Sequence, residues 1–82
     1  MNSNELKAAR IRRGITSKEM AQKLHLTPAQ YSYKESGARR MFLEDAKNIA
    51  NALALTPAEI LLIFFDVNIN SNDNSTFQQV KK

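Results

Sequence analysis

Apolar residues recur at intervals of three to four positions in five separate stretches of the chain. This spacing is typical of helices that bury one face. It predicts helices at residues 5–13, 17–24, 28–36, 43–53 and 57–65. The positions expected to face the core are Leu6, Ala9, Met20, Ala21, Leu24, Tyr31, Leu43, Ala46, Ile49, Ala50 and Leu53. Arg13 lies on the same helical stripe as Leu6 and Ala9. The pattern therefore indicates an all-α fold with five helices.

Three of the predicted helices share the same start signal. A threonine is followed three residues later by Glu or Gln, so its hydroxyl can accept the N3 amide while the N3 side chain returns to the threonine amide. These capping threonines are Thr16, Thr27 and Thr56. Pro28 and Pro57 stand at the first helical position, where the missing N–H costs nothing.

A very short bend separates the second and third predicted helices. Only His25 and Leu26 lie between the second helix and the next capping threonine. Two helices joined in this way cross steeply, which is the geometry of a helix-turn-helix unit. Gly37 is a stop for the third helix, so the unit spans residues 16–37. We interpret His25 as a turn residue rather than a metal ligand or acid–base group, since no second ligand stands at suitable spacing.

The third helix carries few apolar residues for its length. Tyr31 is expected to face the second helix, and the outward strip is small and hydrogen-bonding with one aromatic ring. This strip consists of Pro28, Ala29, Ser32, Tyr33 and Ser36. Such a surface can enter the major groove, about 12 Å wide, without steric or charge conflict. A plain polar surface is the alternative interpretation.

Positive charge is concentrated in the half of the chain that contains this unit. The formal net charge is +4, and residues 1–40 carry nine Lys and Arg against three Glu. Such an asymmetry is the footprint expected of a nucleic-acid binder. Arg39 and Arg40 follow the third helix and are candidates for phosphate contacts, with solvated charge as the alternative. Arg10 is either a phosphate contact or a structural partner for a carboxylate.

Composition excludes several classes of protein. A chain of 82 residues forms one domain with a small core and little room for an enclosed active site. With no Cys and one His, and no paired carboxylates or glycine-rich loop, we expect no enzyme, cofactor, metal or small-molecule ligand. The longest apolar run, residues 60–65, is far shorter than the ~20 residues of a membrane span. Without a signal-peptide pattern, we expect a cytoplasmic protein that does not contact a membrane.

The fifth helix is apolar around its whole circumference from residue 60 to residue 65. A small core cannot cover every face of such a helix, so we expect part of it to meet a second copy of the chain. Residues 67–70 alternate as a short strand does, and the polar segment after them is predicted to be disordered. The candidates for dimer contacts are Leu62, Ile63, Phe64, Phe65, Val67 and Ile69.

Taken together, these positions carry the pattern of a known family. The matching residues are Leu6, Arg10, Gly14, Thr16, Met20, Ala21, Leu24, Thr27, Tyr31, Ser32, Glu35, Ser36, Gly37, Ala46, Ile49, Ala50, Leu53, Thr56, Pro57, Ala58, Glu59 and Ile60. They resemble the lambda-repressor-like (Cro type) helix-turn-helix domains of phage repressors and their bacterial relatives. The resemblance implies a compact five-helix DNA-binding domain over residues 1–66, followed by a short C-terminal extension at 67–82.

The resemblance also implies roles for individual residues. Arg10 and Glu35 are expected to form a structural bridge, which assigns Arg10 to the fold rather than to DNA. The expected base-reading residues are Pro28, Ala29, Gln30, Ser32 and Tyr33. The expected phosphate contacts are Ser17, Lys18, Arg39 and Arg40, the first two with help from the N-terminus of the second helix.

Three positions depart from the family pattern. Ser17 replaces a glutamine that often opens the second helix, which shortens or removes a bridging hydrogen bond. His25 replaces the usual turn glycine, which suggests strain or a slightly different bend. Lys34 stands where an apolar or aromatic residue is commonly buried. Either the third helix is rotated, or the lysine stem covers the core while its ammonium group reaches solvent.

We therefore expect a sequence-specific, double-stranded DNA-binding transcriptional regulator. The resemblance favours a phage or prophage repressor that binds an inverted-repeat operator as a homodimer in the cytoplasm of a bacterial host, associated with the nucleoid when bound. The alternative is a helix-turn-helix scaffold that acts as a protein interaction module: an antitoxin, an antirepressor or an adaptor. The arginine pair at 39–40 and the basic first helix are the features that DNA binding uses and partner binding need not.

Overall fold

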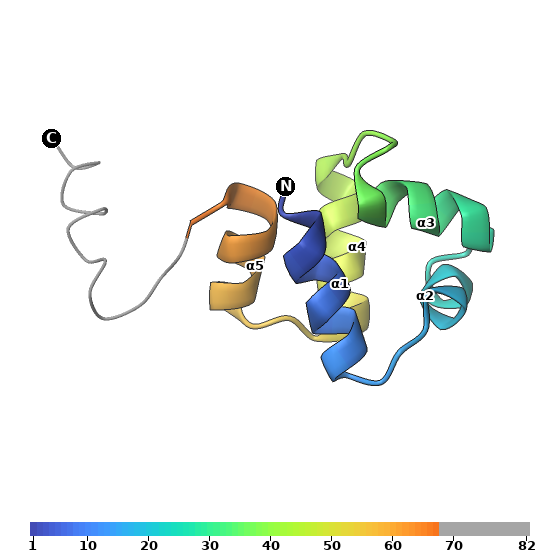
Figure 1. The fold of residues 1–82 in the computed structure, drawn as a ribbon, viewed down its shortest axis with the longest axis horizontal. Coiled ribbons are helices and arrows are strands. Elements are labelled where there is room, and N and C mark those ends of the chain that lie inside the picture. Colours follow the sequence, from blue (N-terminus) through green and yellow to red (C-terminus); the bar gives the residue numbers. More distant parts are fainter. Residues whose placement is uncertain (68–82) are drawn as a thin grey trace, which may run out of the picture.

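Five α-helices account for most of residues 1–67, the part of the chain that this computed structural model describes. They are α1 (Ser3–Arg12), α2 (Ser17–Lys23), α3 (Pro28–Ser36), α4 (Leu43–Leu53) and α5 (Pro57–Phe65). No strand occurs within this range. The prediction of an all-α fold with five helices is confirmed (Figure 1).

Side-chain caps define the helix starts. The capping boxes at Thr16, Thr27 and Thr56 are all present, with hydrogen bonds of 2.8–3.1 Å in both directions. α1 begins two residues earlier than predicted because the Asn2 side chain accepts the Glu5 amide at 3.2 Å. An asparagine oxygen is as good a cap as a hydroxyl, and the apolar spacing alone did not reveal it.

All five helices contribute to one buried core. Its apolar members are Leu6, Ala9, Met20, Ala21, Tyr31, Ile49, Leu53 and Ile63. Burying a large apolar side chain contributes roughly 1.5–3 kcal/mol, so each helix is stabilised by its contacts with the others. Leu24, Ala46 and Ala50, which were expected in the core, are only half-buried, as is Arg13 on the same helical stripe as Leu6 and Ala9.

Two assignments from the sequence are wrong. Leu43 was expected in the core but is 80% exposed, because it is the first residue of α4 and the helix packs through Ile49 and Leu53 instead. Ile63 was a candidate for dimer contacts but is 1% exposed. It points into the core, and its carbonyl accepts the Asn2 amide at 2.6 Å, so it is not available to a partner.

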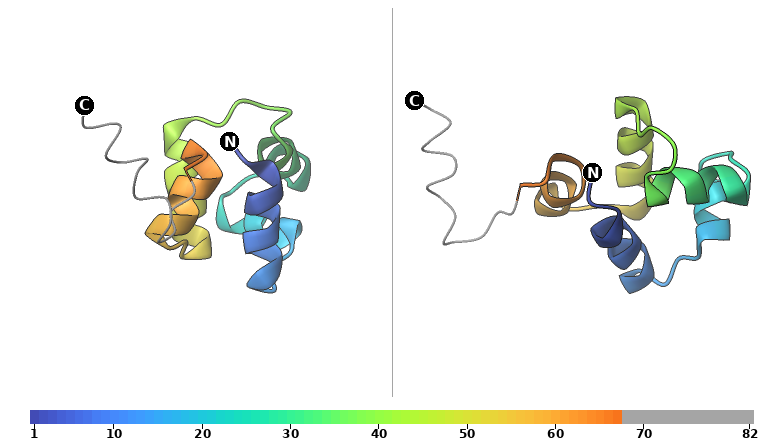
Figure 2. Two further views of the ribbon diagram at one scale, coloured as in Figure 1. Left: turned by 60° about the vertical axis from the view of Figure 1, so that its left-hand side comes forward. Right: turned by 45° about the horizontal axis from the view of Figure 1, so that its top comes forward.

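The helices are arranged around α1. In Figure 1, α1 lies at the centre of the molecule, with α5 on one side and α2 and α3 on the other. The right-hand view of Figure 2 shows α4 standing between α5 and the α2–α3 pair. The most extensive helix contact is between α2 and α3, and α1 contacts both α3 and α5. α1 is therefore the element that connects the helix-turn-helix unit to α5.

The end of α5 is defined by backbone geometry. Asp66 has a φ of 55°, which ends the helix, and the Val67 amide donates to the Leu61 carbonyl at 2.9 Å. Val67 belongs to neither a helix nor a strand. The rest of the predicted strand, including Ile69, lies outside the described residues, as does the polar segment after it. Within residues 1–67, every helix is too short or too polar to cross a bilayer.

Candidate nucleic-acid interface

The bend between α2 and α3 is closed by backbone hydrogen bonds. The Leu26 amide reaches back to the Ala21 carbonyl at 2.8 Å. His25 takes a φ of 58°, the left-handed conformation that the turn requires, and its side chain is exposed. A glycine adopts this conformation at lower cost. The departure at His25 therefore preserves the bend at the expense of local strain.

The inner face of α3 is fixed by a buried polar cluster. Arg10 Nε donates to Glu35 Oε2 at 2.7 Å and Arg10 Nη2 donates to Glu35 Oε1 at 3.2 Å. Tyr31 Oη donates to the same carboxylate at 2.7 Å, and Arg10 Nη1 donates to the Ile15 carbonyl at 2.8 Å. Arg10 and Glu35 are each 8% exposed. The structural bridge implied by the resemblance is thus present.

The chemistry of this cluster follows from its burial. The hydrogen bond to Glu35 raises the pKa of Arg10. Burial, and then the hydrogen bond to Glu35, raise the pKa of Tyr31. Arg10 therefore stays charged and Tyr31 stays neutral at any ordinary pH, and every buried side-chain polar atom within residues 1–67 has a partner. Such a satisfied network fixes the rotation of α3.

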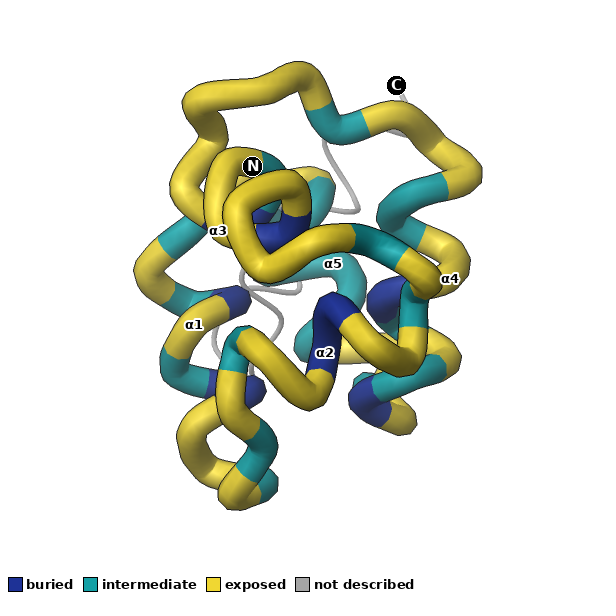
Figure 3. The backbone as a smooth tube through the Cα atoms, turned by 90° about the vertical axis from the view of Figure 1, so that its right-hand side faces the viewer, coloured by how far each residue is buried: buried dark blue, intermediate teal, exposed yellow. Residues whose placement is uncertain are grey.

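The outer face of α3 is open to solvent. Its exposed residues include all five that were expected to read bases: Pro28, Ala29, Gln30, Ser32 and Tyr33. In Figure 3 most of the α3 backbone has the colour of exposed residues, and only Tyr31 and Glu35 of this helix are buried. Gln30 Oε1 accepts the Thr27 amide at 2.9 Å in the capping box. That bond directs the carbonyl oxygen of Gln30 toward the helix start and leaves its amide NH₂ as the donor.

Two arginines follow α3 and are stacked on aromatic rings. The Arg39 guanidinium lies 5.3 Å from the centroid of the Tyr33 ring, and the Arg40 guanidinium lies 5.5 Å from that of Phe42. Both arginines are exposed. At the start of α2, Lys18 is exposed and Ser17 is half-buried. These four residues are the expected phosphate contacts, and they flank the outer face of α3 from its two neighbouring segments.

Lys34 does not require a rotated helix. Its Nζ donates to Asp45 Oδ2 at 3.0 Å, and its side chain is 20% exposed. The stem packs beside the core, as in the second interpretation of this residue. The ammonium group, however, pairs with a carboxylate in the first turn of α4 rather than with solvent alone. The sequence interpretation gave Phe42 no role, and placed Asp45 only as an acidic residue that suits the positive N-terminal end of the fourth helix. The unusual lysine at position 34 was the signal that could have led to them.

The basic end of α1 is turned away from this surface, which corrects an expectation. Arg13 forms two hydrogen bonds with Glu59, at 2.7 and 3.1 Å, and Arg12 forms one at 3.2 Å. Hydrogen bonds from Arg13 and from the Thr56 amide lower the pKa of Glu59 to about 2. The arginines of α1 therefore connect to Glu35 and α5, and the expectation is corrected for them. Lys7 is exposed and lines a hollow together with Ser32 and Ser36 of α3.

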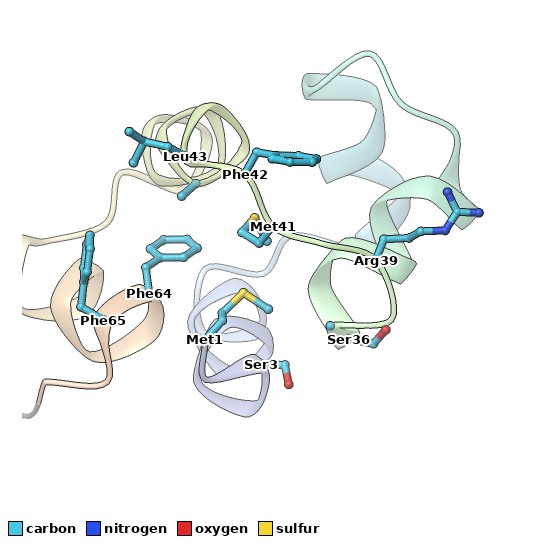
Figure 4. A pocket seen from close by; sticks show the side chains of 11 residues that line it. Met1, Ser3, Ser36, Arg39, Met41, Phe42, Leu43, Phe64 and Phe65 are labelled. Atoms are coloured by element: carbon cyan, nitrogen blue, oxygen red, sulfur yellow. The ribbon is translucent and has the colours of Figure 1, made fainter.

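A hollow with a mixed polar and apolar lining lies on the other side of the arginine loop, between α5, the start of α1 and the start of α4. It encloses about 560 Å³. Its apolar lining consists of Met1, Met41, Phe42, Leu43, Ala46, Phe64 and Phe65. Figure 4 shows Met1, Met41 and Phe64 converging on its centre, with Arg39 at its edge. We call this region the α5 hollow.

The dimer candidates divide into three groups. Phe64 is half-buried and Phe65 exposed, and both line the α5 hollow. Leu62 and Val67 are half-buried without lining it. Ile63 is in the core, as described above. Among residues 1–67, no cluster of three His, Asp or Glu side chains could hold a metal ion.

Comparison with known proteins agrees with this geometry. The family model described as "Helix-turn-helix domain" matches residues 3–62, which is most of the chain and includes all five helices in whole or in part. No curated protein and no solved structure matches the chain. The chain belongs to the helix-turn-helix domain family, a family of DNA-binding regulators.

Proposed function

We propose that this protein is a sequence-specific regulator of transcription that reads double-stranded DNA with α3. One observation carries the proposal: the inner face of α3 is locked by Arg10, Tyr31 and Glu35, while its outer face is exposed and made of small and hydrogen-bonding side chains. A rigid helix with such a face fits a major groove. Pro28 and Ala29 offer apolar contact to thymine methyl groups.

The hydrogen-bonding groups of the outer face supply the discrimination. Gln30 contributes an amide donor, Ser32 a hydroxyl and Tyr33 a phenol, and each is exposed. A good contact to a base edge is worth roughly 1–3 kcal/mol of discrimination. The Arg39 guanidinium stacks on the ring of Tyr33, so a proposed phosphate contact and a proposed base-reading residue touch each other at the C-terminal end of α3.

Phosphate contacts hold α3 in register. The proposed contacts are Lys18 and Ser17 at the start of α2, and Arg39 and Arg40 in the loop after α3. Each cation that neutralises a phosphate adds close to one to the slope of log affinity against log salt concentration. Binding is therefore expected to weaken steeply as salt rises.

A Cro-type repressor binds an inverted repeat as a homodimer, and the α5 hollow supports this part of the proposal. Three large apolar residues that line the hollow are exposed in the single chain: Phe42, Leu43 and Phe65. They lie beside the loop that follows the proposed reading helix. Exposed apolar patches of this kind mark interaction surfaces. For an inverted repeat, the proposal requires that the paired copies present their two α3 helices to half-sites about 34 Å apart.

The direct test is selection of bound duplexes from a random pool at two salt concentrations. The expected product is one symmetric site, and replacing Ser32 and Tyr33 together with Ala is expected to weaken binding to that site about tenfold or more while sparing random DNA. Unchanged affinity and unchanged sequence preference in this double variant would remove α3 from the role of reader. Thermal unfolding of the variant checks that it is folded.

Arginine variants test the phosphate contacts with a matched control. Arg39→Ala and Arg40→Ala are each expected to lower the salt slope by about one. Arg12→Ala removes the same charge at the C-terminal end of α1, which lies at the opposite end of the molecule from the α3–α4 loop (Figures 1 and 2). This control is expected to leave the slope nearly unchanged. Equal salt slopes for Arg39→Ala, Arg40→Ala and Arg12→Ala would mean that the arginine loop makes no phosphate contact of its own.

The α5 hollow also favours a second candidate function, a protein interaction module such as an antitoxin, an antirepressor or an adaptor. In that case the hollow, not α3, is the working surface. Sedimentation at tens of micromolar protein separates the two, with Phe65→Ser as the test variant. A dimer that dissociates in the variant and loses operator affinity supports the repressor. A monomer that binds random DNA and a symmetric site equally weakly supports the interaction module.

A further inference from the structure

Lys34 occupies an unusual place for a cation on a proposed reading helix. It lies on α3, three residues from Tyr31, yet its ammonium group is directed to α4 rather than to solvent. Nζ donates to Asp45 Oδ2 at 3.0 Å and to the Arg40 carbonyl at 3.4 Å. The Lys34 and Asp45 side chains are 20% and 26% exposed. The ion pair is therefore partly shielded, and it spans the loop that carries both arginines.

Asp45 has a second partner at the start of α4. The same oxygen, Oδ2, accepts the Phe42 amide at 3.0 Å. Phe42 precedes the first residue of α4 and has no side-chain acceptor of its own, so Asp45 supplies the cap. One carboxylate thus links α3, the end of the loop and the start of α4.

The ring of Phe42 completes the cluster. Lys34 Nζ lies 5.6 Å from its centroid and the Arg40 guanidinium lies 5.5 Å from it. Cations at this distance from an aromatic ring are attracted to it. Arg40 is therefore held at its carbonyl by Lys34 and at its guanidinium by Phe42. Phe42 is exposed and also lines the α5 hollow.

We propose that Lys34, Asp45 and Phe42 are positioning residues that hold the arginine loop in its DNA-binding geometry. This inference rests on the proposed function, because it assigns the cluster a role at the same interface. None of the three residues needs to touch DNA. They lower the cost of binding by ordering Arg40 before the phosphate arrives.

The competing role for Lys34 is a direct phosphate contact, and the two roles give opposite signs at Asp45. If Lys34 binds phosphate, neutralising Asp45 frees the ammonium group and removes a negative charge near DNA, so affinity rises. If Lys34 and Asp45 position the loop, the same change loosens Arg40 and affinity falls. The sign at Asp45 therefore decides between the two.

Asp45→Asn is the main test variant. Its amide oxygen can still accept the Phe42 amide, so the cap of α4 is retained while the ion pair is lost. Glu44→Gln is the matched control, because it removes one negative charge from the same turn. Within residues 1–67, Glu44 is exposed and its carboxylate forms no hydrogen bond or ion pair.

The measurement is affinity of the full chain for its selected duplex at several salt concentrations. Asp45→Asn is expected to weaken binding about threefold to tenfold, the range for ordering one long side chain. Glu44→Gln is expected to leave binding unchanged or slightly tighter. In an Arg40→Ala background, Asp45→Asn is expected to have no further effect, because the residue it positions is gone.

Two further variants address the lysine and the ring. Lys34→Met keeps an unbranched stem over the core and is expected to lower DNA affinity as much as Asp45→Asn does. The double variant Lys34→Met with Asp45→Asn is expected to bind no more weakly than either single variant. Phe42→Leu removes the aromatic ring and is expected to weaken DNA binding to a similar extent. Phe42→Tyr keeps the ring and is expected to bind DNA as the wild type does. Thermal unfolding of each variant separates these effects from loss of the fold.

The outcomes are distinct. Affinity that rises in Asp45→Asn, or that matches Glu44→Gln, overturns the positioning role while leaving the proposed function intact. A full effect of Asp45→Asn in the Arg40→Ala background overturns it as well. Failure of the wild-type chain to select any duplex overturns the proposed function, and the positioning role with it.

Discussion

Two arginines of α1 each pair with a glutamate on another helix, and the two pairs differ in burial. Arg10 reaches Glu35 on α3 with two hydrogen bonds, and both side chains are almost fully buried. Arg13 reaches Glu59 on α5, also with two hydrogen bonds, but the Glu59 side chain is 20% exposed. The first pair fixes α3, the proposed reading helix, and the second fixes α5, which borders the α5 hollow.

The difference lies in what else each carboxylate does. Glu35 accepts from Tyr31 as well as Arg10, so it is the centre of an interior cluster. Glu59 accepts the Thr56 amide at 2.9 Å, so it caps α5 while it pairs with Arg13. A buried charge that loses its partner is costly, whereas a partly exposed one is rescued by water. The two pairs should therefore respond very differently to the loss of one member.

The largest effect is expected from Glu35→Ala. It leaves the Arg10 guanidinium buried without its partner, which is expected to cost about 3–5 kcal/mol. Denaturant unfolding measures this loss, and DNA binding should fail with it because the rotation of α3 is no longer fixed. Arg10→Met with Glu35→Met in one chain is the control, since removing both charges avoids the unpaired ion. A loss below 1 kcal/mol in Glu35→Ala would contradict the importance assigned to burial.

Glu59→Gln is expected to have a smaller effect, about 1–2 kcal/mol after allowance for solvent screening. Its folded pKa of about 2 lies below the ordinary value of 4.5. The contribution is therefore present above about pH 5 and is lost as pH falls through the folded pKa. Unfolding free energy measured from pH 7 to pH 2 should fall less in the variant than in the wild type. Parallel curves would show that Glu59 does not drive the acid loss.

Tyr31→Phe removes one hydrogen bond to Glu35 and keeps the buried ring. The expected loss is about 1 kcal/mol, because Arg10 still satisfies the carboxylate. The pKa of Tyr31 is raised in the folded state, so its contribution is lost as pH rises above the ordinary value near 10. The variant should accordingly lose less stability between pH 9 and pH 11, as followed by chemical unfolding. Identical alkaline behaviour would point to another titrating group.

The smallest effect is expected from Arg12→Gln. Its single hydrogen bond to Glu59 is 3.2 Å long and its side chain is 55% exposed. An exposed pair of this kind contributes less than about 0.5 kcal/mol. Arg13→Gln, changed in the same way, should cost more because it loses both bonds to the carboxylate. Equal losses in thermal unfolding would mean that exposure does not separate the two arginines.

Local structure could be predicted because its causes lie within a few residues. Thr16, Thr27 and Thr56 each bond to a residue three positions away, so the helix starts do not depend on the rest of the fold. The positive φ at His25 and the stop at Gly37 are equally local. The exposed strip on α3 followed from helical spacing and the single buried ring of Tyr31.

The limits of prediction appear where residues far apart in sequence meet. Arg13 and Glu59 are separated by 46 positions, and nothing near the arginine signals its partner. Lys34 and Asp45 belong to different helices, so the lysine alone left two arrangements open. The Arg10–Glu35 bridge was anticipated only through the family resemblance, because residue spacing does not specify a contact across 25 positions.

The sequence by itself determined five helices, the threonine caps of three of them and the steep bend between α2 and α3, since hydrogen bonds between near neighbours specify them. Only the tertiary structure decided which side of each apolar helix is covered. It placed Ile63 inside and Leu43 outside, although both are aliphatic residues in predicted helices. The physical reason is that burial depends on how helices pack, and packing is a property of all five together.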